Sequence, residues 1–377
     1  MRIGFDGRLL LRPLRGMAVY INNVFHELIS TDSKNEFRMY VDTHFAYNAP
    51  PKTYAPVLDA FKKYPNFSIV DINASNAFQW EQICLPKKIR EERLDILHMP
   101  ANRAPFLCPA KKMVVTVHDM IEMIFFKEYF RTLRGLRGRF YDYRVGLYIT
   151  FMYKKIFPRA DMIITDSEHS RHDIHRITGT PLAKIKVSHL AQNAMFKKLD
   201  VPREDYLLSF GSVAIHKNCE NVLRAFAALP EKLKRTYKLL MIGKTPQLET
   251  LAKELGEKNI VFQDADFSPK LVETFNKALG FVFASHYEGF GIPPVEAMAC
   301  GTPVIASTAS SVPEVVGDAA LLVNPADPTQ IRDAMEKILS SETTRQKLSD
   351  AGLKRVQLFS WKKAADIHRE LFAQIME

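Results

Sequence analysis

Residues 288–304 read EGFGIPPVEAMACGTPV and follow an apolar run at 280–284 that predicts a buried strand. The glycines of this stretch allow the backbone to approach a ligand closely, and its two prolines suit the first turn of a helix. We expect that helix over 295–300, with Gly301 ending it. A strand, a glycine loop and a helix in this order predict one unit of a doubly wound α/β sheet. The free N–H groups where the helix begins suit a diphosphate.

Two carboxylates lie eight residues apart in this stretch. Glu288 is expected on the glycine loop and Glu296 in the first turn of the helix. Both side chains are therefore able to face one ligand at different depths. The alternative for Glu296 is that its charge only complements the positive end of the helix.

Short apolar segments bounded by charged or turn residues recur on both sides of this stretch, and they predict further buried parallel strands with helices between them. The predicted strands lie at 2–6, 95–98, 113–117, 162–165, 207–211, 237–243, 259–262 and 303–306, and an amphipathic helix is expected at 17–29. A polar linker near 196–205 divides the series. We therefore expect an α/β chain of two doubly wound, Rossmann-like domains, 1–195 and 200–360, facing a cleft. The C-terminal helix, at about 361–377, is expected to pack back on the first domain.

Length and composition agree with this prediction. The chain has 377 residues, of which 47% are hydrophobic and 25% charged, as is typical of a globular protein of two domains. No apolar stretch approaches the roughly 18 residues of a membrane-spanning helix, and charged residues near the start argue against an export signal. The four cysteines form no C-x-x-C pair, which fits a reducing compartment. We expect a cytoplasmic protein.

The excess of basic residues belongs entirely to the first half of the chain. Residues 1–195 carry 29 Lys and Arg against 19 Asp and Glu, a net charge of +10, whereas residues 196–377 carry 23 of each. One interpretation is a solvated basic face. The other is an anionic partner: a membrane surface, a lipid-phosphate acceptor or nucleic acid. A dense cluster beside aromatic residues is the candidate membrane contact, and it consists of Arg131, Arg134, Arg137 and Arg139.

The frame around Glu288 and Glu296 resembles the retaining GT-B glycosyltransferases that carry an E-x7-E motif (glycosyltransferase family 4, glycosyl transferases group 1). The resemblance covers nearly the whole chain and implies a GT-B fold. It implies that Glu288 is catalytic and contacts the transferred sugar, and that Glu296 holds the ribose hydroxyls. A carboxylate accepts hydrogen bonds from a vicinal diol, which agrees with these roles. The donor-binding residues that the resemblance implies are Gly16, Gly211, Ser212, Lys217, Glu288, Gly289, Phe290, Gly291, Ile292 and Glu296.

The segment 211–218, GSVAIHKN, resembles the family's glycine turn that ends in Lys-Asn. The resemblance implies that Lys217 is catalytic, because a fixed cation beside the diphosphate stabilises the charge that develops as the glycosidic bond breaks. Relatives often carry an arginine where this chain has Ser212 and His216. His216 either replaces that cation or is a polar residue of the turn, and both interpretations stay open.

The first domain offers a second set of residues. A predicted strand ends in His118-Asp119, which resembles the family's His-Asp pair. The resemblance implies that His118 is catalytic and reaches the donor sugar, while Asp119 orients the following turn. Gly16 occupies the family's first glycine loop, which approaches the donor phosphates. Ser167 and Glu314 belong to segments near the cleft in this family, and helix capping explains each of them equally well.

These residues predict a retaining, metal-independent glycosyltransferase that moves a hexose from a nucleoside-diphosphate sugar to a glycan or lipid-linked acceptor in surface polysaccharide or glycoconjugate synthesis. No nucleophile is evident, which points to front-face substitution. No D-x-D triad lies in suitable surroundings, so we expect no metal, and no cofactor besides the donor. UDP-glucose is the first candidate donor and GDP-mannose the second. A peripheral position on the inner face of the membrane is compatible with the cytoplasmic prediction.

Other classes of protein fit less well. A nicotinamide oxidoreductase needs G-x-G-x-x-G after a strand and a P-loop enzyme needs G-x-x-x-x-G-K-[ST], and the sequence has neither. A nucleic-acid-binding protein does not need the E-x7-E frame, so nucleic acid is not expected as a partner. A sugar phosphorylase or a sugar-nucleotide epimerase with the same fold is the remaining alternative.

Overall fold

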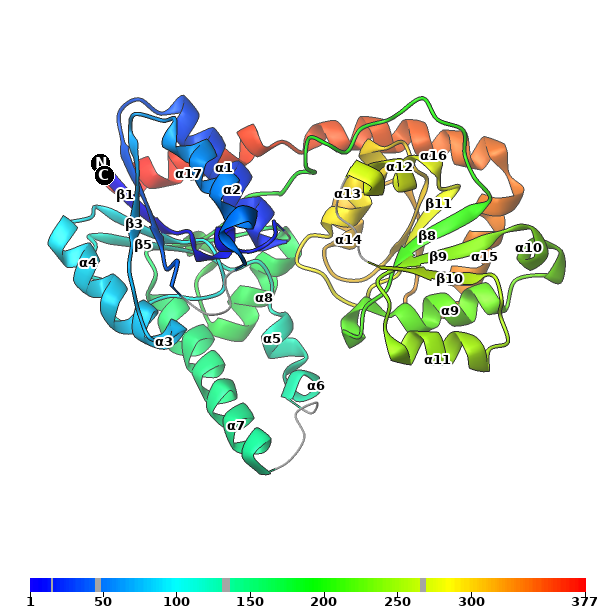
Figure 1. Cartoon of the computed structure of the whole chain (residues 1–377), viewed down its shortest axis with the longest axis horizontal. Coiled ribbons are helices and arrows are strands. Elements are labelled where there is room, and N and C mark those ends of the chain that lie inside the picture. Colours follow the sequence, from blue (N-terminus) through cyan, green and yellow to red (C-terminus); the bar gives the residue numbers. More distant parts are fainter. Residues whose placement is uncertain (15, 45–48, 131–135, 265–268) are drawn as a thin grey trace. The chain divides into compact units, whose positions relative to one another are not determined.

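The computed structural model describes residues 1–14, 16–44, 49–130, 136–264 and 269–377 (Figure 1). These residues form two compact units. Unit 1 comprises Met1–Leu190 and Ser360–Glu377, and unit 2 comprises Ala191–Phe359. The sequence prediction drew the domains at 1–195 and 200–360 and assigned the last helix to the first of them.

Unit 1 is built on a seven-stranded parallel sheet in the order β3-β2-β1-β4-β5-β6-β7. Its strands are β1 (Arg2–Asp6), β2 (Glu36–Val41), β3 (Phe67–Asp71), β4 (Ile96–Met99), β5 (Lys112–Thr116), β6 (Met162–Thr165) and β7 (Ile185–Val187). The sequence predicted β1, β4, β5 and β6, but not β2, β3 or β7. The strand order reverses between β1 and β4, and the loops at the carboxyl ends beside such a switch point are where α/β sheets bind ligands.

The helices of unit 1 include α1, which is the helix predicted at 17–29 and which buries Tyr20, Phe25 and Leu28. α17 packs against α1, so the chain returns to unit 1 after it has completed unit 2. The α-helices are α1 (Met17–Thr31), α2 (Pro51–Lys62), α3 (Ala77–Gln79), α4 (Leu85–Glu92), α5 (Ile121–Ile124), α6 (Phe126–Phe130), α7 (Leu136–Phe151), α8 (Glu168–Thr178) and α17 (Trp361–Gln374). The short 3-10 and π segments are η1 (Arg8–Leu11), η2 (Trp80–Cys84), η3 (Met152–Ile156), η4 (Phe157–Arg159) and η5 (Leu182–Lys184).

Unit 2 repeats the plan with six parallel strands in the order β10-β9-β8-β11-β12-β13, and its switch point lies between β8 and β11. The strands are β8 (Tyr206–Phe210), β9 (Lys238–Ile242), β10 (Ile260–Gln263), β11 (Gly280–Phe283), β12 (Val304–Ser307) and β13 (Ala320–Val323). Of these, β13 was not predicted. The helices are η6 (Ile215–Lys217), α9 (Cys219–Ala227), α10 (Glu231–Thr236), α11 (Pro246–Glu254), α12 (Pro269–Lys277), α13 (Ile292–Ala299), α14 (Val312–Val316), α15 (Pro328–Ser340), α16 (Glu342–Arg355) and η7 (Val356–Leu358).

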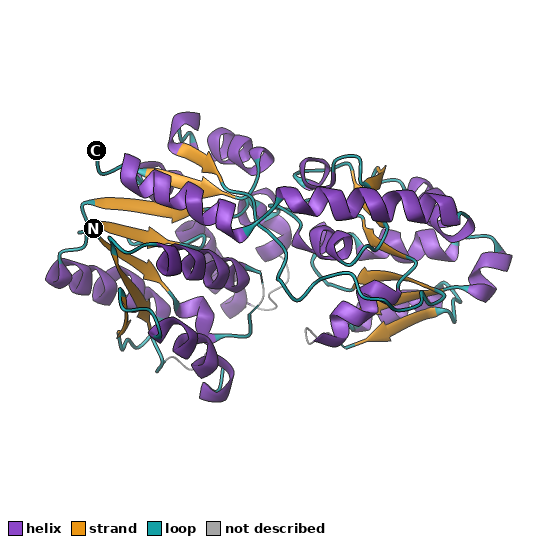
Figure 2. Ribbon diagram, turned by 90° about the horizontal axis from the view of Figure 1, so that it is seen from above, coloured by secondary structure: helices purple, strands orange, loops and turns teal. Residues whose placement is uncertain are grey.

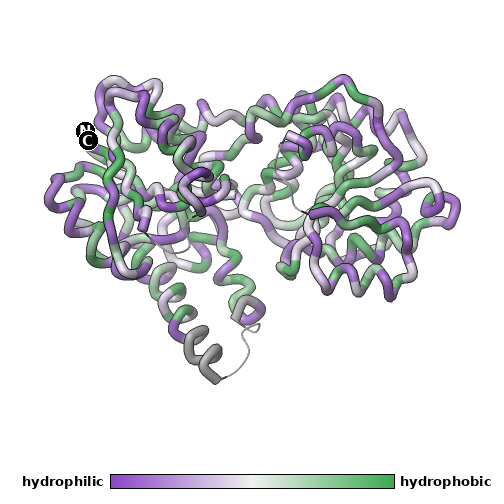
Figure 3. The backbone as a smooth tube through the Cα atoms, in the orientation of Figure 1, coloured by the Kyte–Doolittle hydropathy of each residue, from purple (hydrophilic) through white to green (hydrophobic). Residues whose placement is uncertain are grey.

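Helices cover both faces of each sheet (Figure 2), which explains why the central strands are mostly apolar in the sequence. Every residue of β4, β11 and β12 is buried. The hydrophobic segments follow the strands inside each unit, while the outer turns are hydrophilic (Figure 3). Within the residues that the structure describes, no helix is both long and apolar enough to cross a membrane.

Candidate active site

The candidate donor site of unit 2 lies at the carboxyl ends of β8 and β11, the two strands at the switch point of the sheet. Lys217 follows β8 and Glu288 follows β11. The Lys217 Nζ lies 2.8 Å from Oε1 and 2.9 Å from Oε2 of Glu288, so the ammonium bridges both carboxylate oxygens. The Glu288 side chain is 9% exposed, whereas that of Lys217 is 34% exposed. The pair therefore has a cation that solvent reaches and a carboxylate that fixes it.

Two serines hold the loop that carries Glu288. The Ser310 hydroxyl oxygen accepts a hydrogen bond from the backbone N–H of Glu288 at 2.9 Å. The Ser311 hydroxyl donates to the backbone carbonyls of Glu288 and Phe290 at 3.0 and 3.1 Å, and Ser311 is fully buried. These bonds fix the backbone on both sides of Gly289. The sequence pointed to Glu314 in this segment, and the structure shows that two serines just before it contact the loop.

The turn after β8 depends on two glycines that face each other. A Cβ built on Gly211 would lie 2.1 Å from the carbonyl oxygen of Gly243, and one built on Gly243 would lie 2.5 Å from that of Gly211. Neither position has room for a side chain, so the backbones after β8 and β9 come into direct contact. The Ser212 hydroxyl then accepts a hydrogen bond from the Ala214 N–H at 3.1 Å and stabilises the turn. The sequence predicted Gly211 but gave no sign that Gly243 is its partner.

Asn218 anchors the segment that presents Lys217. Its backbone is left-handed, with φ of 56°, and its side-chain amide donates to the carbonyls of Ala284 and Pro325 at 2.8 and 2.6 Å. The carbonyl of His216 accepts from the His286 N–H at 2.7 Å. Burial, and then the charge of Lys217, lowers the pKa of His216, so its ring is uncharged at neutral pH. Of the two interpretations left open for His216, the polar turn residue therefore fits better than a second cation.

Helix α13 begins earlier than the sequence predicted. Gly291 is its N-cap, with φ of 94°, and the helix runs Ile292–Ala299 rather than 295–300. Glu296 is consequently the fifth helical residue and lies in the second turn, so the prediction that it occupies the first turn was wrong. The reason is that Ile292 and the two prolines already form the first turn, because proline is well accommodated there.

The environment of Glu296 is unusual for a carboxyl group. It is half-buried, and burial raises its pKa to about 8. Within the described residues no donor or cation reaches its carboxylate. Gly289 and Phe290 of the preceding loop are buried, and Ile292 is half-buried. The Glu296 carboxylate is thus a partly desolvated hydrogen-bond acceptor that follows the glycine loop in the sequence.

Unit 1 places His118 directly after β5, close to the end of β6. Its Nδ1 lies 2.8 Å from Oδ2 of Asp166 and its Nε2 lies 3.2 Å from the carbonyl oxygen of Pro100. Burial alone would lower the pKa of His118, but the charge of Asp166 and the hydrogen bond to it outweigh burial and raise that pKa. Both partners are acceptors, which favours a doubly protonated ring. Asp166, 48 residues away in sequence, is the partner that the His-Asp motif did not reveal.

The remaining predicted residues of unit 1 have local roles that the structure describes. The Asp119 carboxylate accepts from the Ile121 N–H at 2.9 Å, so Asp119 does orient its turn. Ser167 caps α8 by accepting from the Ser170 N–H at 3.1 Å. Gly16 is the N-cap of α1, with φ of 48°, and a Cβ there would meet no atom within 4 Å. Gly16 and His118 belong to unit 1, whereas the Lys217 and Glu288 pair belongs to unit 2.

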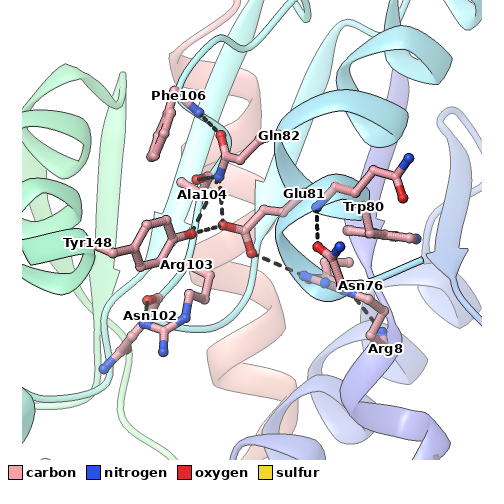
Figure 4. A network of polar contacts seen from close by, with 12 residues as sticks. Arg8, Asn76, Trp80, Glu81, Gln82, Asn102, Arg103, Ala104, Phe106 and Tyr148 are labelled. Atoms are coloured by element: carbon pink, nitrogen blue, oxygen red, sulfur yellow. Dashed lines mark hydrogen bonds and ion pairs between the residues drawn. The ribbon is translucent and has the colours of Figure 1, made fainter. Parts of the chain in front are cut away.

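A further polar network lies beside the carboxyl end of β1 and was not predicted (Figure 4). The Arg8 guanidinium bonds the Asp6 carboxylate at 2.7 Å, lies 3.7 Å above the Trp80 ring and contacts Glu81 at 3.3 Å. The hydroxyl of Tyr148 donates to the other oxygen of Glu81. In the sequence, Asp6 ended the first predicted strand, and both Asp6 and Arg8 were read as charges near the start of the chain. The contact of Arg8 with a glutamate more than seventy residues later depends on the fold.

In the described part of the chain, one group of side chains has ligand atoms close enough together to hold a metal ion. It consists of Asp42, His44 and Asp71, at the carboxyl ends of β2 and β3, and His44 and Asp71 are exposed. Both oxygens of Asp71 already accept from Thr43, and Asp42 accepts from the His44 N–H. These bonds explain the cluster as turn-stabilising, and no metal site is assigned to it.

Comparison with known proteins gives mannosyltransferases as sequence relatives. Over 242 residues the chain is 29% identical to the serotype-specific mannosyltransferase WbdA of Escherichia coli, covering 59% of this chain and 30% of that protein. Over 233 residues it is 29% identical to the O-antigen chain mannosyltransferase B of the same organism, covering 56% of this chain and 61% of that protein. The matched region thus spans only about a third to three fifths of the length of these relatives.

Solved structures show the same fold over the whole chain. Sucrose-phosphate synthase from Thermosynechococcus elongatus has a TM-score of 0.73 at 18% identity, covering 100% of this chain and 99% of that one. The HepE protein of Anabaena, solved in complex with UDP-glucose, has a TM-score of 0.70 at 14% identity, covering 99% and 100%. With two parallel-sheet α/β units, the chain has the GT-B fold.

Sequence families cover both units. Residues 15–191 match the family described as Glycosyltransferase Family 4, and residues 191–355 match Glycosyl transferases group 1. These two matches cover nearly the whole chain, and the relatives and the fold agree with them. The chain belongs to the GT-B glycosyltransferases of family 4 and group 1.

Proposed function

We propose that this protein is a retaining, metal-independent glycosyltransferase that transfers a hexose from a nucleoside-diphosphate sugar to a glycan or lipid-linked acceptor. The observation that carries the proposal is the Lys217–Glu288 pair, in which both carboxylate oxygens hold one partly exposed ammonium. Membership of the family and the mannosyltransferase relatives support the reaction class.

The proposed chemistry assigns a task to each part of the unit 2 site. When the bond to the sugar breaks, negative charge grows on the leaving diphosphate. Lys217, held by Glu288, and the N–H groups where α13 begins supply positive charge for it without a metal ion. Glu288 contacts the transferred sugar, and Glu296 accepts hydrogen bonds from the ribose hydroxyls. With no covalent partner from the protein, the acceptor hydroxyl attacks from the face that the diphosphate leaves, and an oxygen of the leaving diphosphate takes the hydroxyl proton. The new bond to the sugar therefore retains the configuration.

For the donor, we propose GDP-mannose first and UDP-glucose second. The sequence alone ranked them in the opposite order. The relatives named as mannosyltransferases favour mannose, whereas the HepE structure with UDP-glucose supports the second candidate. A thermal-shift panel with GDP, UDP, dTDP and ADP separates the bases, because the nucleotide that binds most tightly stabilises the folded protein most.

Transfer itself is tested by incubating the protein with GDP-mannose or UDP-glucose, with and without acceptor glycans, and by determining the anomeric configuration of the product. Product formation that survives a chelator supports the proposal, and loss that Mg²⁺ or Mn²⁺ restores contradicts its metal-free part. Release of sugar 1-phosphate on addition of inorganic phosphate would instead identify a phosphorylase. Interconversion of the donor sugar without acceptor would identify an epimerase.

We also propose that unit 1 contacts an anionic membrane, where a lipid-linked acceptor would lie. Arg131 and Arg134 of the predicted cluster lie outside the described residues, as do the side chains of Arg137 and Arg139. Support comes from the end of α7 and the segment after it. There the exposed Leu147 and Phe151 precede the exposed Lys154 and Lys155. The Phe78 ring, also exposed, lies 6.1 Å from that of Tyr148 and extends this surface of apolar and basic side chains.

A further inference from the structure

A buried hydrogen-bond chain in unit 1 links β4, β5, α1 and α17. The His98 Nε2 lies 2.8 Å from the Thr116 Oγ1, which lies 2.8 Å from the Tyr20 hydroxyl. The Tyr20 hydroxyl lies 2.7 Å from the His368 Nε2. All four residues are at most 1% exposed. The last member comes from α17, a segment that lies 348 residues from Tyr20 in sequence.

The hydrogen bond of His368 to Ala364 fixes which atom donates in every other bond of this hydrogen-bond chain. The His368 Nδ1 lies 2.7 Å from the carbonyl oxygen of Ala364, which only accepts, so the proton of an uncharged His368 ring is on Nδ1. The His368 Nε2 then accepts from the Tyr20 hydroxyl, which in turn accepts from Thr116. Thr116 is left to accept from the His98 Nε2–H. In this order the His98 Nδ1, which has no partner in the described residues, carries a lone pair and no proton, so no buried N–H is left without an acceptor.

Burial keeps both end rings uncharged. It lowers the pKa of His368 to about 4 and lowers the pKa of His98 well below its ordinary value. The chain therefore keeps one arrangement of protons throughout the neutral range. Tyr20 has no rotational freedom left at its hydroxyl, because it donates to one neighbour and accepts from another.

Tyr20, a middle member of this hydrogen-bond chain, lies close to two residues of the candidate active site. The Tyr20 ring lies edge-on to the His118 ring with centroids 4.9 Å apart. Thr116 is the last residue of β5, two residues before His118, and Gly16 is the N-cap of the helix that carries Tyr20. A shift of Tyr20 would therefore move its contact with His118 and the start of the helix at Gly16.

We propose that His368 is a positioning residue of the active site, acting through Tyr20 on His118 and on the Gly16 loop. The inference rests on the proposed function, because it gives His118 and Gly16 their part in transfer. The competing explanation is that the four groups only satisfy one another in the core. That explanation predicts loss of stability on mutation, but full turnover wherever the protein is still folded.

The first test is independent of any activity. Imidazole 15N and 1H NMR at neutral pH should report His98 protonated only at Nε2 and His368 only at Nδ1. In Tyr20→Phe, which removes one oxygen, the His118 signals should shift, because its edge-on neighbour has lost both of its fixed hydrogen bonds. The reverse tautomer at His368, or His118 signals that do not move in Tyr20→Phe, would overturn the proposal.

The second test measures turnover well below the unfolding temperature of each variant. Tyr20→Phe and His368→Phe should each lower kcat by about tenfold or more and change the affinity for the nucleoside diphosphate much less, because Lys217 and Glu288 lie in unit 2. The double variant should be no worse than either single one. His368→Gln, which retains an acceptor for the Tyr20 hydroxyl, should recover most of the activity.

The matched control is His26→Phe. His26 is also on α1, but its ring stacks on Phe61 at 3.7 Å and takes no part in the chain. Its kcat should stay within twofold of the wild-type value, roughly the scatter of such measurements. A folded His368→Phe protein with wild-type kcat would refute the positioning role. If the wild-type protein transfers no sugar at all, the proposed function fails, while the NMR test still decides the hydrogen-bond chain.

Discussion

The raised pKa of Glu296 should couple nucleotide binding at the donor site to the release of a proton. Burial holds this pKa at about 8, so at pH 7 most molecules carry a neutral Glu296. Ribose hydroxyls that donate to the carboxylate stabilise its charged form and lower that pKa. Binding of the nucleoside diphosphate should therefore release a proton below about pH 8, and affinity should rise with pH up to that value.

Calorimetry in two buffers of different ionisation enthalpy measures this proton directly. The wild-type protein should release up to one proton per nucleotide at pH 7, and Glu296→Gln should release none. Glu296→Gln should also weaken binding by about 1–3 kcal/mol if the amide fails to satisfy both hydroxyls. Equal proton release in both proteins would show that Glu296 does not contact the ligand.

Lys217 is expected to matter more for turnover than for binding, because the charge it faces grows as the glycosidic bond breaks. Lys217→Met should lower kcat by a larger factor than it lowers the affinity for the donor, as measured by steady-state kinetics and nucleotide binding. Lys217→Arg retains the charge and is the control. A loss confined to KM would assign Lys217 to ground-state binding alone.

At the scale of elements, the start of α13 depends on the left-handed backbone of Gly291. Its φ of 94° is one that residues with a Cβ rarely adopt, so Gly291→Ala should shift the first turn of the helix. We expect a loss of about 1–3 kcal/mol in unfolding free energy and weaker diphosphate binding, because the N–H groups of that turn move. Urea denaturation and nucleotide titration provide the two measurements.

Gly256→Ala is the control for this prediction. Gly256 also has a left-handed backbone, with φ of 71°, and a Cβ there meets nothing within 4 Å. It follows α11, away from the loops that carry Lys217 and Glu288. The control variant should lose comparable stability while binding the nucleotide as the wild type does. Equal nucleotide binding by Gly291→Ala and Gly256→Ala would show that the first turn of α13 does not contribute to the donor site.

Strands that pair on both sides were predicted except for β2, and of the four edge strands only β10 was predicted. β11 and β12 are buried on both faces, so their sequences are apolar apart from Ser307 at the end of β12. β3 pairs on one side only, and four of its five residues are half-buried. Such a half-buried edge strand mixes polar and apolar residues and so resembles a loop in the sequence. β13 is also an edge strand, but its four residues are all apolar, so this explanation does not apply to it.

The candidate site divides in a similar way. Glu288, Gly291 and Glu296 lie in one short segment, so the spacing of their residue types could be recognised directly. The partners of the predicted residues could not be, because Lys217 and Glu288 are 71 residues apart and His118 and Asp166 are 48 apart. Such pairs form because parallel strands bring their carboxyl ends together. Short segments of sequence do not predict the order of the strands in a sheet.

At the scale of the whole molecule, the uneven charge predicts where a membrane would bind. Reversing Lys154 and Lys155 to Glu should reduce binding to vesicles of acidic lipid, by roughly 1 kcal/mol for each basic residue that lies near the surface. Added salt should weaken the wild-type interaction, because the Debye length is only about 8 Å at physiological ionic strength. Vesicle sedimentation at low and high salt measures both effects.

The control reverses Lys232 and Arg235, two exposed basic residues of α10 in unit 2. This variant has the same net charge as the first one, but we expect it to bind vesicles as the wild type does. Equal loss in both variants would show that only the total charge matters. Absence of vesicle binding by the wild-type protein at low salt would leave the basic half as a solvated surface.

Because α17 belongs to unit 1, translation completes unit 2 before it completes unit 1. Unit 2 runs from residue 191 to 359, or 169 residues, which takes roughly 10 to 30 s to translate at about 5–20 residues per second. During that interval the nascent unit 1 lacks His368, and the face of α1 that α17 covers stays open to chaperones. Unit 2 is contiguous and can fold first. Released chains truncated after residue 359 should therefore carry a protease-resistant unit 2 beside a protease-sensitive unit 1.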